Sequence, residues 1–174
     1  MKDIEYLIAK AKSKIFNNKE HINLFFRNQG MRIGVNCNIV GNISTPEADL
    51  ISIGNNVTVG DQVDFITHDN SISKIDDKCY NLFGRITIGD NCFIGERSII
   101  MYGVTLANNI IVASGSVVVN SFSEEKIIIG GNPAVKIGTW DNFYKKSRYK
   151  AMSRTAYKSV IETNPEMFIE RKVK

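Results

Sequence analysis

The sequence predicts an all-β solenoid, in which short strands coil and stack on one another, and three observations lead to that prediction. Aliphatic residues recur every six positions along one stretch of the chain: Ile88, Ile94, Ile100, Leu106, Val112 and Val118. Asn and Gly, which reach left-handed backbone conformations at low cost, gather at the third and fourth positions of the six-residue unit. The same pattern occurs upstream, in residues 33–44 and 53–64.

The six-residue unit fits a strand followed by a corner. Its fifth position is also small or apolar, so inward-facing side chains fall two residues apart, as a strand requires. Each coil must then stack on the next, because a neighbouring coil supplies the partners for its backbone groups. A helix does not explain the pattern, since six residues match no 3.6-residue period and Asn and Gly disfavour helices. The repeat therefore predicts a parallel β-solenoid.

The repeat is interrupted between residues 64 and 86. Ile53 and Ile88 are 35 positions apart, one short of a multiple of six, so part of this segment leaves the coil. We expect an extruded loop over residues 65–85. The loop contains the stretch FITHDNS with His68, one of the two histidines in the chain. Further along, KIDDKCYNLFGR offers carboxylates and aromatic rings that suit either a sugar or packing within the loop itself.

The two ends of the chain differ from the repeat. We expect residues 1–30 to be a helical segment, in which residues 3–16 form a short amphipathic helix with an apolar stripe at helical spacing, made of Ile4, Leu7, Ile8, Ala11 and Ile15. The stripe is short, which favours a helix that packs on the protein over a membrane anchor. The second histidine, His21, is interpreted as structural or surface. Residues 139–174 form a basic tail that we expect to be helical, and residues 31–138 remain as the solenoid domain.

Composition narrows the class of protein. The net charge of +4 is concentrated in the tail, where nine Lys or Arg face four Asp or Glu from Asp141 to Lys174. The tail has no sustained run of like charge and no aromatic-glycine motif, so we expect no nucleic-acid partner. Three widely spaced cysteines argue against a disulfide framework or a zinc site. Without a signal-peptide core or an apolar run of membrane length, a cytoplasmic protein with no stable membrane insertion is expected.

The tandem repeat, the THD of the loop and the ending IIIGGNPAVKI together resemble the hexapeptide-repeat acyltransferases. The resemblance covers residues 31–140 and points to the maltose, galactoside and capsular-polysaccharide O-acetyltransferase branch. It implies a left-handed parallel β-helix of triangular section, an exception to the usual right-handed crossover. It also implies a homotrimer with active sites between neighbouring subunits, acetyl-CoA as the donor and no metal.

The same resemblance assigns roles to residues near the loop. His68, flanked by Thr67 and Asp69, matches the family's base by position, and histidine suits that role near neutral pH. A base histidine needs an acceptor that fixes its tautomer, and three candidates stay open: Asp69 beside it, Asp49 about one coil earlier, or a backbone carbonyl. The backbone N–H of Glu96 aligns with the family's donor to the oxyanion.

Donor binding is implied for residues of the later coils and of the GGNPA turn: Tyr102, Gly103, Ala113, Ser114, Gly131, Asn132, Pro133 and Lys136. The chain departs from the family at Tyr102, where many relatives have Pro, and at Ala107, where many have Gly. Many relatives also carry a basic residue directly after GNPA, whereas here Val135 precedes Lys136, and one step along a strand reverses the face. Alternative partners for the CoA phosphates are Lys126, Lys145 and Lys146.

Three functions follow as hypotheses from these features. The first is acetyl-CoA-dependent O-acetylation of a saccharide by direct transfer, with His68 as general base. The second is N-acetylation of an amino-sugar nucleotide. The third is a non-catalytic solenoid scaffold or polysaccharide-binding module. A zinc hydratase resembling the γ-type carbonic anhydrases is excluded, because three histidine ligands are needed and the chain has two histidines.

Overall fold

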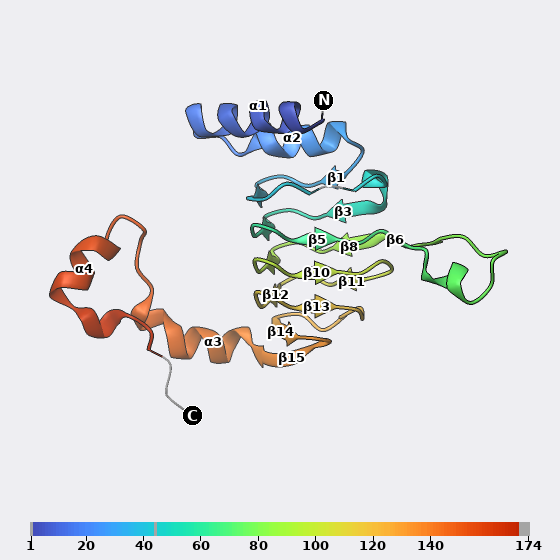
Figure 1. The fold of residues 1–174 in the computed structure, drawn as a ribbon. Coiled ribbons are helices and arrows are strands. Elements are labelled where there is room, and N and C mark those ends of the chain that lie inside the picture. The colour runs from blue at the N-terminus through green and yellow to red at the C-terminus, as the bar shows by residue number, and fades with distance from the viewer. Residues whose placement is uncertain (1, 44, 171–174) are drawn as a thin grey trace. The chain divides into compact units, whose positions relative to one another are not determined.

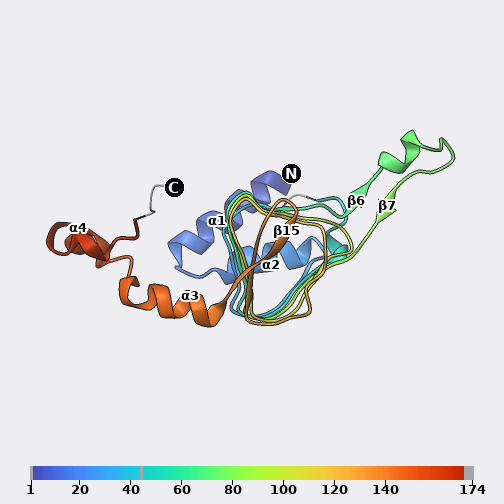
Figure 2. The same cartoon turned by 90° about the horizontal axis from the view of Figure 1, so that it is seen from below.

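A computed structural model of the chain describes residues 2–43 and 45–170. Contacts between Cα atoms divide the chain into two units, residues 1–137 and residues 138–174. The first unit is a stack of coils whose short strands line up into sheets (Figure 1). Viewed along the stack, successive coils superpose, and one loop extends away from them (Figure 2).

Three sheets form the walls of the stack. Sheet A has four strands, which are β1 (Arg32–Ile33), β3 (Ile51–Ile53), β8 (Ile86–Ile88) and β11 (Thr105–Leu106). Sheet B has six, which are β2 (Asn38–Ile39), β4 (Thr58–Val59), β9 (Phe93–Ile94), β12 (Ile110–Val112), β14 (Ile127–Gly131) and β15 (Ala134–Thr139). Sheet C has three, which are β5 (Asp64–Phe65), β10 (Ile99–Ile100) and β13 (Val117–Val118). In the three coils that have a strand in every sheet, the chain passes from A to B to C, so the stack has an A–B, a B–C and a C–A corner.

Apart from β14 and β15, which are joined by Asn132 and Pro133, strands that are neighbours in these sheets come from successive coils and pair in parallel. The step between equivalent corner residues is 20 residues for the first coil, 35 for the second and 18 for the third. The second step is long because it includes the extruded loop. The first coil is also longer than the third, which changes the residue that stands beside the loop.

The A–B corner shows why Asn recurs in the repeat. Asn36, Asn56, Asn91 and Asn109 all have φ between 55° and 59°, in the left-handed region where Asn is tolerated. Their side chains also bond from coil to coil, with N···O distances of 3.0, 2.7 and 2.8 Å. We call these four residues the asparagine ladder. The ladder sets the turn and ties neighbouring coils together.

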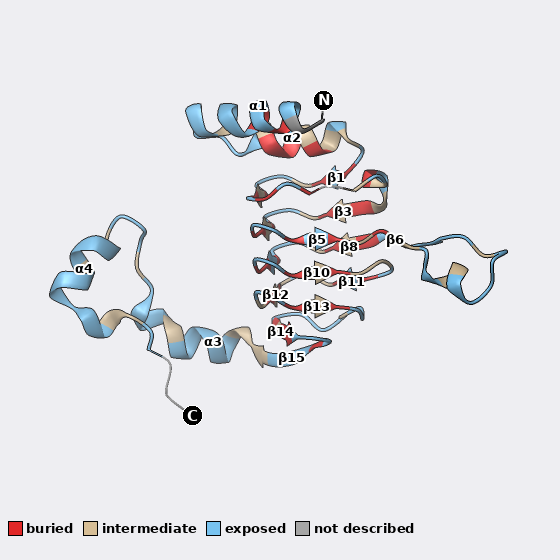
Figure 3. Cartoon of the chain, viewed as in Figure 1, coloured by how far each residue is buried: buried red, intermediate tan, exposed pale blue. Residues whose placement is uncertain are grey.

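The aliphatic residues of the repeat fill the interior of the stack, coloured red in Figure 3. Six of them are at most 1 % exposed, namely Ile88, Ile94, Ile100, Leu106, Val112 and Val118. Removing such side chains from water is the main favourable contribution to folding. The aliphatic residues that recur every six positions are therefore the ones that face the interior of the stack.

Two helices, α1 (Lys2–Ile15) and α2 (Glu20–Asn28), cover the first end of the stack (Figure 1). Phe26 of α2 is fully buried, and Tyr6 of α1 packs on it and donates to the Val40 carbonyl at 3.4 Å. The expectation that the apolar stripe of α1 packs on the protein is wrong, because Ile4 and Leu7 are 64 % and 61 % exposed. The opposite face of α1, with Tyr6 and Ala9, makes the contact instead.

The second unit contains α3 (Trp140–Ser147), the short 3-10 helices η3 (Arg148–Lys150) and η4 (Pro165–Met167), and α4 (Tyr157–Thr163). Thr139 caps α3 by accepting a hydrogen bond from the Asn142 N–H at 3.4 Å. Lys150 Nζ donates to the Phe168 carbonyl at 3.0 Å. Across the described residues of both units, no helix has the length and apolar character needed to cross a bilayer.

Candidate active site

The coil opens after β5, and the chain leaves the C–A corner as a two-stranded ribbon. Its strands, β6 (His68–Asp69) and β7 (Leu82–Phe83), pair antiparallel, with His68 opposite Phe83. The Gly84 N–H donates to the Thr67 carbonyl at 3.0 Å and closes the base of the ribbon. The ribbon carries the 3-10 helix η2 (Ser71–Lys74) and projects from the stack (Figures 1 and 2). The predicted extruded loop therefore places His68 at its root.

The His68 ring is held by a carboxylate from the preceding coil. His68 Nδ1 lies 2.9 Å from Glu47 Oε2, and the same oxygen accepts from the Thr67 hydroxyl at 2.7 Å. Thr67 is 2 % exposed, so this hydroxyl is fixed within the wall of the coil. With Nδ1 donating to Glu47, the lone pair of the imidazole is on Nε2, where a general base needs it.

Glu47 is ionised in this arrangement. The Thr67 hydroxyl has the largest effect and lowers the pKa of the Glu47 carboxyl. Burial raises this pKa by less, and the hydrogen bond and charge of His68 lower it further. An ionised carboxylate favours the imidazolium that forms when His68 accepts a proton. The pair is thus suited to take a proton from a hydroxyl and return it later.

A hollow of about 220 Å³ lies beside His68. It is lined by Thr45, Pro46, Phe65, Ile66, Thr67 and His68. On the ribbon side, the Phe83 ring centroid is 5.8 Å from that of His68. The His68 side chain is 41 % exposed, so a substrate hydroxyl can reach it.

Neither predicted aspartate hydrogen-bonds to His68. Asp69 accepts from the Ser71 N–H at 2.7 Å and from the Tyr102 hydroxyl at 3.5 Å, and the Ser71 amide is the main cause of its lowered pKa. Asp49 lies in the 3-10 helix η1 (Ala48–Leu50) and is exposed. Glu47 was missed because a coil of 18 residues was assumed, whereas it precedes His68 by 21 positions. The 20-residue spacing of Ile33 and Ile53 in the sequence is the signal that could have found it.

The residues expected to bind the donor lie at two corners. Tyr102 and Gly103 follow β10 at the C–A corner, where the Gly103 N–H donates to the Arg85 carbonyl at 3.1 Å. Glu96 lies at the B–C corner, and Ala113 and Ser114 occupy that corner in the next coil.

Close stacking leaves no room for a side chain at Gly60 and Gly95 of the B–C corner. A Cβ on Gly60 would come within 2.7 Å of the Glu96 nitrogen, and one on Gly95 within 2.4 Å of the Ser114 nitrogen. Within the described part of the chain, the Glu96 N–H donates no hydrogen bond. This amide lies at a different corner of the stack from His68.

The GGNPA turn follows β14. Gly131 has a φ of 104°, which favours glycine, and its N–H donates to the Ser116 hydroxyl at 3.3 Å. Asn132 and Pro133 are exposed and joined by a cis peptide bond. Lys136 is paired with Glu124 at 2.5 Å. Lys145 and Lys146 belong to the second unit, in the last turn of α3.

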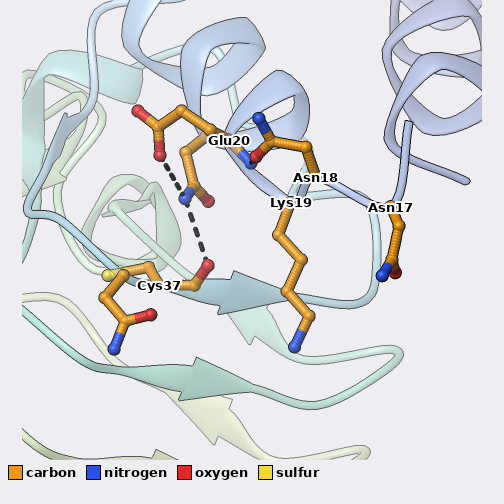
Figure 4. Close-up of a pocket in the computed structure, with 7 residues that line it drawn as sticks. Asn17, Asn18, Lys19, Glu20 and Cys37 are labelled. Carbon is orange, nitrogen blue, oxygen red and sulfur yellow. Dashed lines mark hydrogen bonds between the residues drawn. The ribbon is translucent and has the colours of Figure 1, made fainter.

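A second hollow of about 380 Å³ lies between α2 and the first coil (Figure 4). Its buried Asn23 donates to Glu20 Oε2 at 3.0 Å and to the Cys37 carbonyl at 3.1 Å. Among the described residues, the Asn23 Oδ1 has no hydrogen-bond partner. No histidine lines this hollow, so it offers no base for hydroxyl chemistry near neutral pH.

The chain belongs to the hexapeptide-repeat acyltransferases, as its repeat predicts. The evidence for membership is the similarity of this chain to Protein CapG of Staphylococcus aureus. The two sequences are 42 % identical over 125 residues, which cover 69 % of this chain and 72 % of CapG. Residues 85–119 also match the family described as "Hexapeptide repeat of succinyl-transferase". The chain is therefore an acyltransferase, and the acyltransferase family predicted from the sequence is confirmed.

Solved structures show the same fold. A maltose O-acetyltransferase from Clostridium difficile 630 aligns with a TM-score of 0.53 and 23 % identity, over 79 % of this chain and 87 % of that one. A hexapeptide-repeat acetyltransferase from Vibrio cholerae, VCA0836 in complex with acetyl coenzyme A, aligns with a TM-score of 0.52 and 25 % identity, over 64 % and 61 %.

Proposed function

We propose that the protein transfers the acetyl group of acetyl-CoA to a hydroxyl group of a saccharide, with His68 as general base. The observation that carries the proposal is the His68–Glu47 pair at 2.9 Å beside an open hollow. The Vibrio cholerae relative was solved with acetyl coenzyme A, which supports this donor. The family's left-handed sense of coiling and its homotrimeric assembly are part of the same proposal.

The reaction proceeds by direct transfer. The saccharide oxygen attacks the thioester carbon while its proton passes to His68 Nε2, and Glu47 stabilises the imidazolium. The oxyanion that forms accepts a hydrogen bond from the Glu96 N–H of a neighbouring subunit. The C–S bond then breaks, and the thiolate takes the proton back from His68. The products are the acetyl ester and free CoA, and both charge and protons balance.

The two corners explain why a neighbouring subunit is needed. His68 lies at the C–A corner and Glu96 at the B–C corner, with the whole of sheet C between them. One chain does not bring both groups to one substrate. In a cyclic trimer, the C–A corner of one chain faces the B–C corner of the next, which completes the site three times over.

A screen of sugar acceptors tests this proposal. Wild-type protein and acetyl-CoA are mixed with hydroxyl-bearing and amino sugars, and free thiol release is followed. We expect release with a hydroxyl acceptor and a fall in kcat/KM of about 10²- to 10⁴-fold for His68→Ala. His21→Ala removes the other histidine, half-buried in α2, and serves as the matched control. Activity of His68→Ala equal to that of His21→Ala would rule out the assigned base, and activity with amino sugars alone would replace O-transfer by N-transfer.

A further inference from the structure

Helix α1 has two faces, and the more apolar one is turned to solvent. Tyr6 and Ala9 are 6 % and 8 % exposed and face the protein. The residues of the opposite face recur at helical spacing and are exposed; we call them the outer stripe: Ile4, Leu7, Ile8, Ala11 and Ile15. An amphipathic helix normally buries its apolar face, so a partner for the outer stripe is to be expected.

The outer stripe is large and accessible. Ile4, Leu7 and Ile15 are 64 %, 61 % and 75 % exposed, and Ile8 is 49 % exposed. From Ile4 to Ile15 the stripe is about 16 Å long at 1.5 Å per residue. Helix α1 lies outside α2 at the end of the stack, with its exposed surface coloured pale blue (Figures 1 and 3). The outer stripe therefore faces away from the coils.

Lysines flank the outer stripe on both sides. Lys10 and Lys14 follow one edge and Lys12 the other, and all three are exposed. Glu5 is an acidic residue on the Lys12 edge. The Lys10 ammonium lies 5.7 Å from the centroid of the Tyr6 ring. The stems of Lys12 and Lys14 can lie along the apolar surface while their ammonium groups reach outward. Such an arrangement complements a surface that is apolar inside and negatively charged at its boundary.

Two occupants fit an exposed apolar helix face, and the charges decide between them. A second copy of α1 meeting the first stripe to stripe would bring the flanking lysines of both copies together, which is unfavourable. An anionic lipid surface pairs each ammonium group with a headgroup and receives the aliphatic side chains between the acyl chains. Helix α1 has 14 residues and is too short to span the bilayer, which leaves a position parallel to its surface.

We infer that the outer stripe of α1 docks the protein on an anionic membrane surface. The proposal is independent of the acetyl-transfer site, which lies at the C–A corner. Docking places α1 in the interface with its lysines at the headgroups, and leaves the coils outside the lipid.

Vesicle flotation of the full-length protein tests the inference. The vesicles contain either phosphatidylcholine alone or phosphatidylcholine with phosphatidylglycerol. We expect flotation only with phosphatidylglycerol, and a fall in the bound fraction of about tenfold for the double variant Leu7→Ser, Ile15→Ser. Lys10→Gln, Lys14→Gln should weaken binding in the same direction and reduce its dependence on salt. The four substituted residues are exposed, so we expect both double variants to fold, and thermal unfolding checks this.

Matched controls separate the outer stripe from other sources of binding. Ile75→Ser changes an 84 % exposed isoleucine in the extruded ribbon and should leave flotation unchanged. Lys145→Gln, Lys146→Gln tests the basic second unit. Wild-type protein that does not float, or flotation that depends on the second unit and not on the stripe, would overturn the inference. A change in oligomeric state of the stripe variant without a change in flotation would identify a chain–chain interface and overturn it as well.

Discussion

His68 depends for its orientation on a residue from another coil. A lone imidazole on a ribbon is free to rotate and to exchange tautomers, so its basic nitrogen points at substrate only part of the time. The bond from Nδ1 to Glu47 removes that freedom, and the Thr67 hydroxyl fixes Glu47 in turn. The three groups form one hydrogen-bonded unit, of which only His68 meets the substrate in the proposed mechanism.

Glu47 is therefore a positioning residue, and Glu47→Gln tests its role. The amide keeps the shape but loses the charge that stabilises the imidazolium, so we expect kcat to fall about 10- to 100-fold with KM nearly unchanged. Steady-state kinetics with acetyl-CoA and a productive sugar measures both constants. Glu162→Gln, an exposed change in α4, is the control. A raised KM with an unchanged kcat would instead make Glu47 a binding residue.

Stability toward acid follows from the same carboxylate. The pKa of Glu47 is lower in the folded protein than its ordinary value of 4.5. Its contribution to the free energy of unfolding is therefore present above pH 4.5 and is lost as the pH falls through the folded pKa. Wild-type protein should lose stability more steeply than Glu47→Gln below about pH 4.5. Urea unfolding at several acidic pH values measures the difference. If the free energy of unfolding of the two proteins falls equally with pH in this range, Glu47 is not held by Thr67 and His68.

At the scale of elements, the regular coils were predictable and the irregular one was not. Inward positions such as Ile94 and Val112 are fixed by burial, which leaves a six-residue trace in the sequence. The first coil has a 20-residue step, and its extra length falls where Glu47 stands, so repeat counting misplaced the partner of His68. Helix α2 was not predicted as a separate helix, because its nine residues hold only a short apolar pattern, with Ile22 and Phe26 four positions apart.

The face by which α1 packs was also wrongly predicted from its pattern. Hydrophobic periodicity identifies an apolar face but does not say what that face meets. Here Tyr6 makes the contact with the protein through its ring and hydroxyl, although it lies outside the apolar stripe. Tertiary contacts of one large side chain outweighed the pattern of several smaller ones.

The asparagine ladder gives a test at this scale. Asn91 has a φ of 56° and bonds through its side chain to Asn56 and Asn109. Asn91→Ala loses these bonds and places Ala in a left-handed conformation, which costs about 1–2 kcal/mol for the backbone alone. Asn91→Gly loses the bonds but keeps the conformation accessible. We expect Ala to lower the free energy of unfolding more than Gly, measured by urea denaturation, and equal losses would assign the role of Asn91 to the side-chain bonds alone.

At the scale of the whole molecule, the proposed mechanism gives one chain two halves of different sites. The proposed base, His68, lies at the C–A corner, while Glu96 and the small residues beside it lie at the B–C corner. Sheet C separates the two corners in every coil that contains it. Assembly, and not a conformational change, is what the proposed mechanism requires to bring them together.

Mixing two inactive variants tests the shared site most directly. His68→Ala removes the base, and Ser114→Trp fills the B–C corner at an exposed position, so each should be inactive alone. After the subunits are mixed in equal amounts and reassembled, half of the C–A corners and half of the B–C corners are intact. We expect acetyl transfer to recover to roughly a quarter of the wild-type rate, because random assembly joins two intact corners that often. Mixtures that stay inactive although mixed trimers have formed would contradict a site built from His68 of one subunit and the B–C corner of the next.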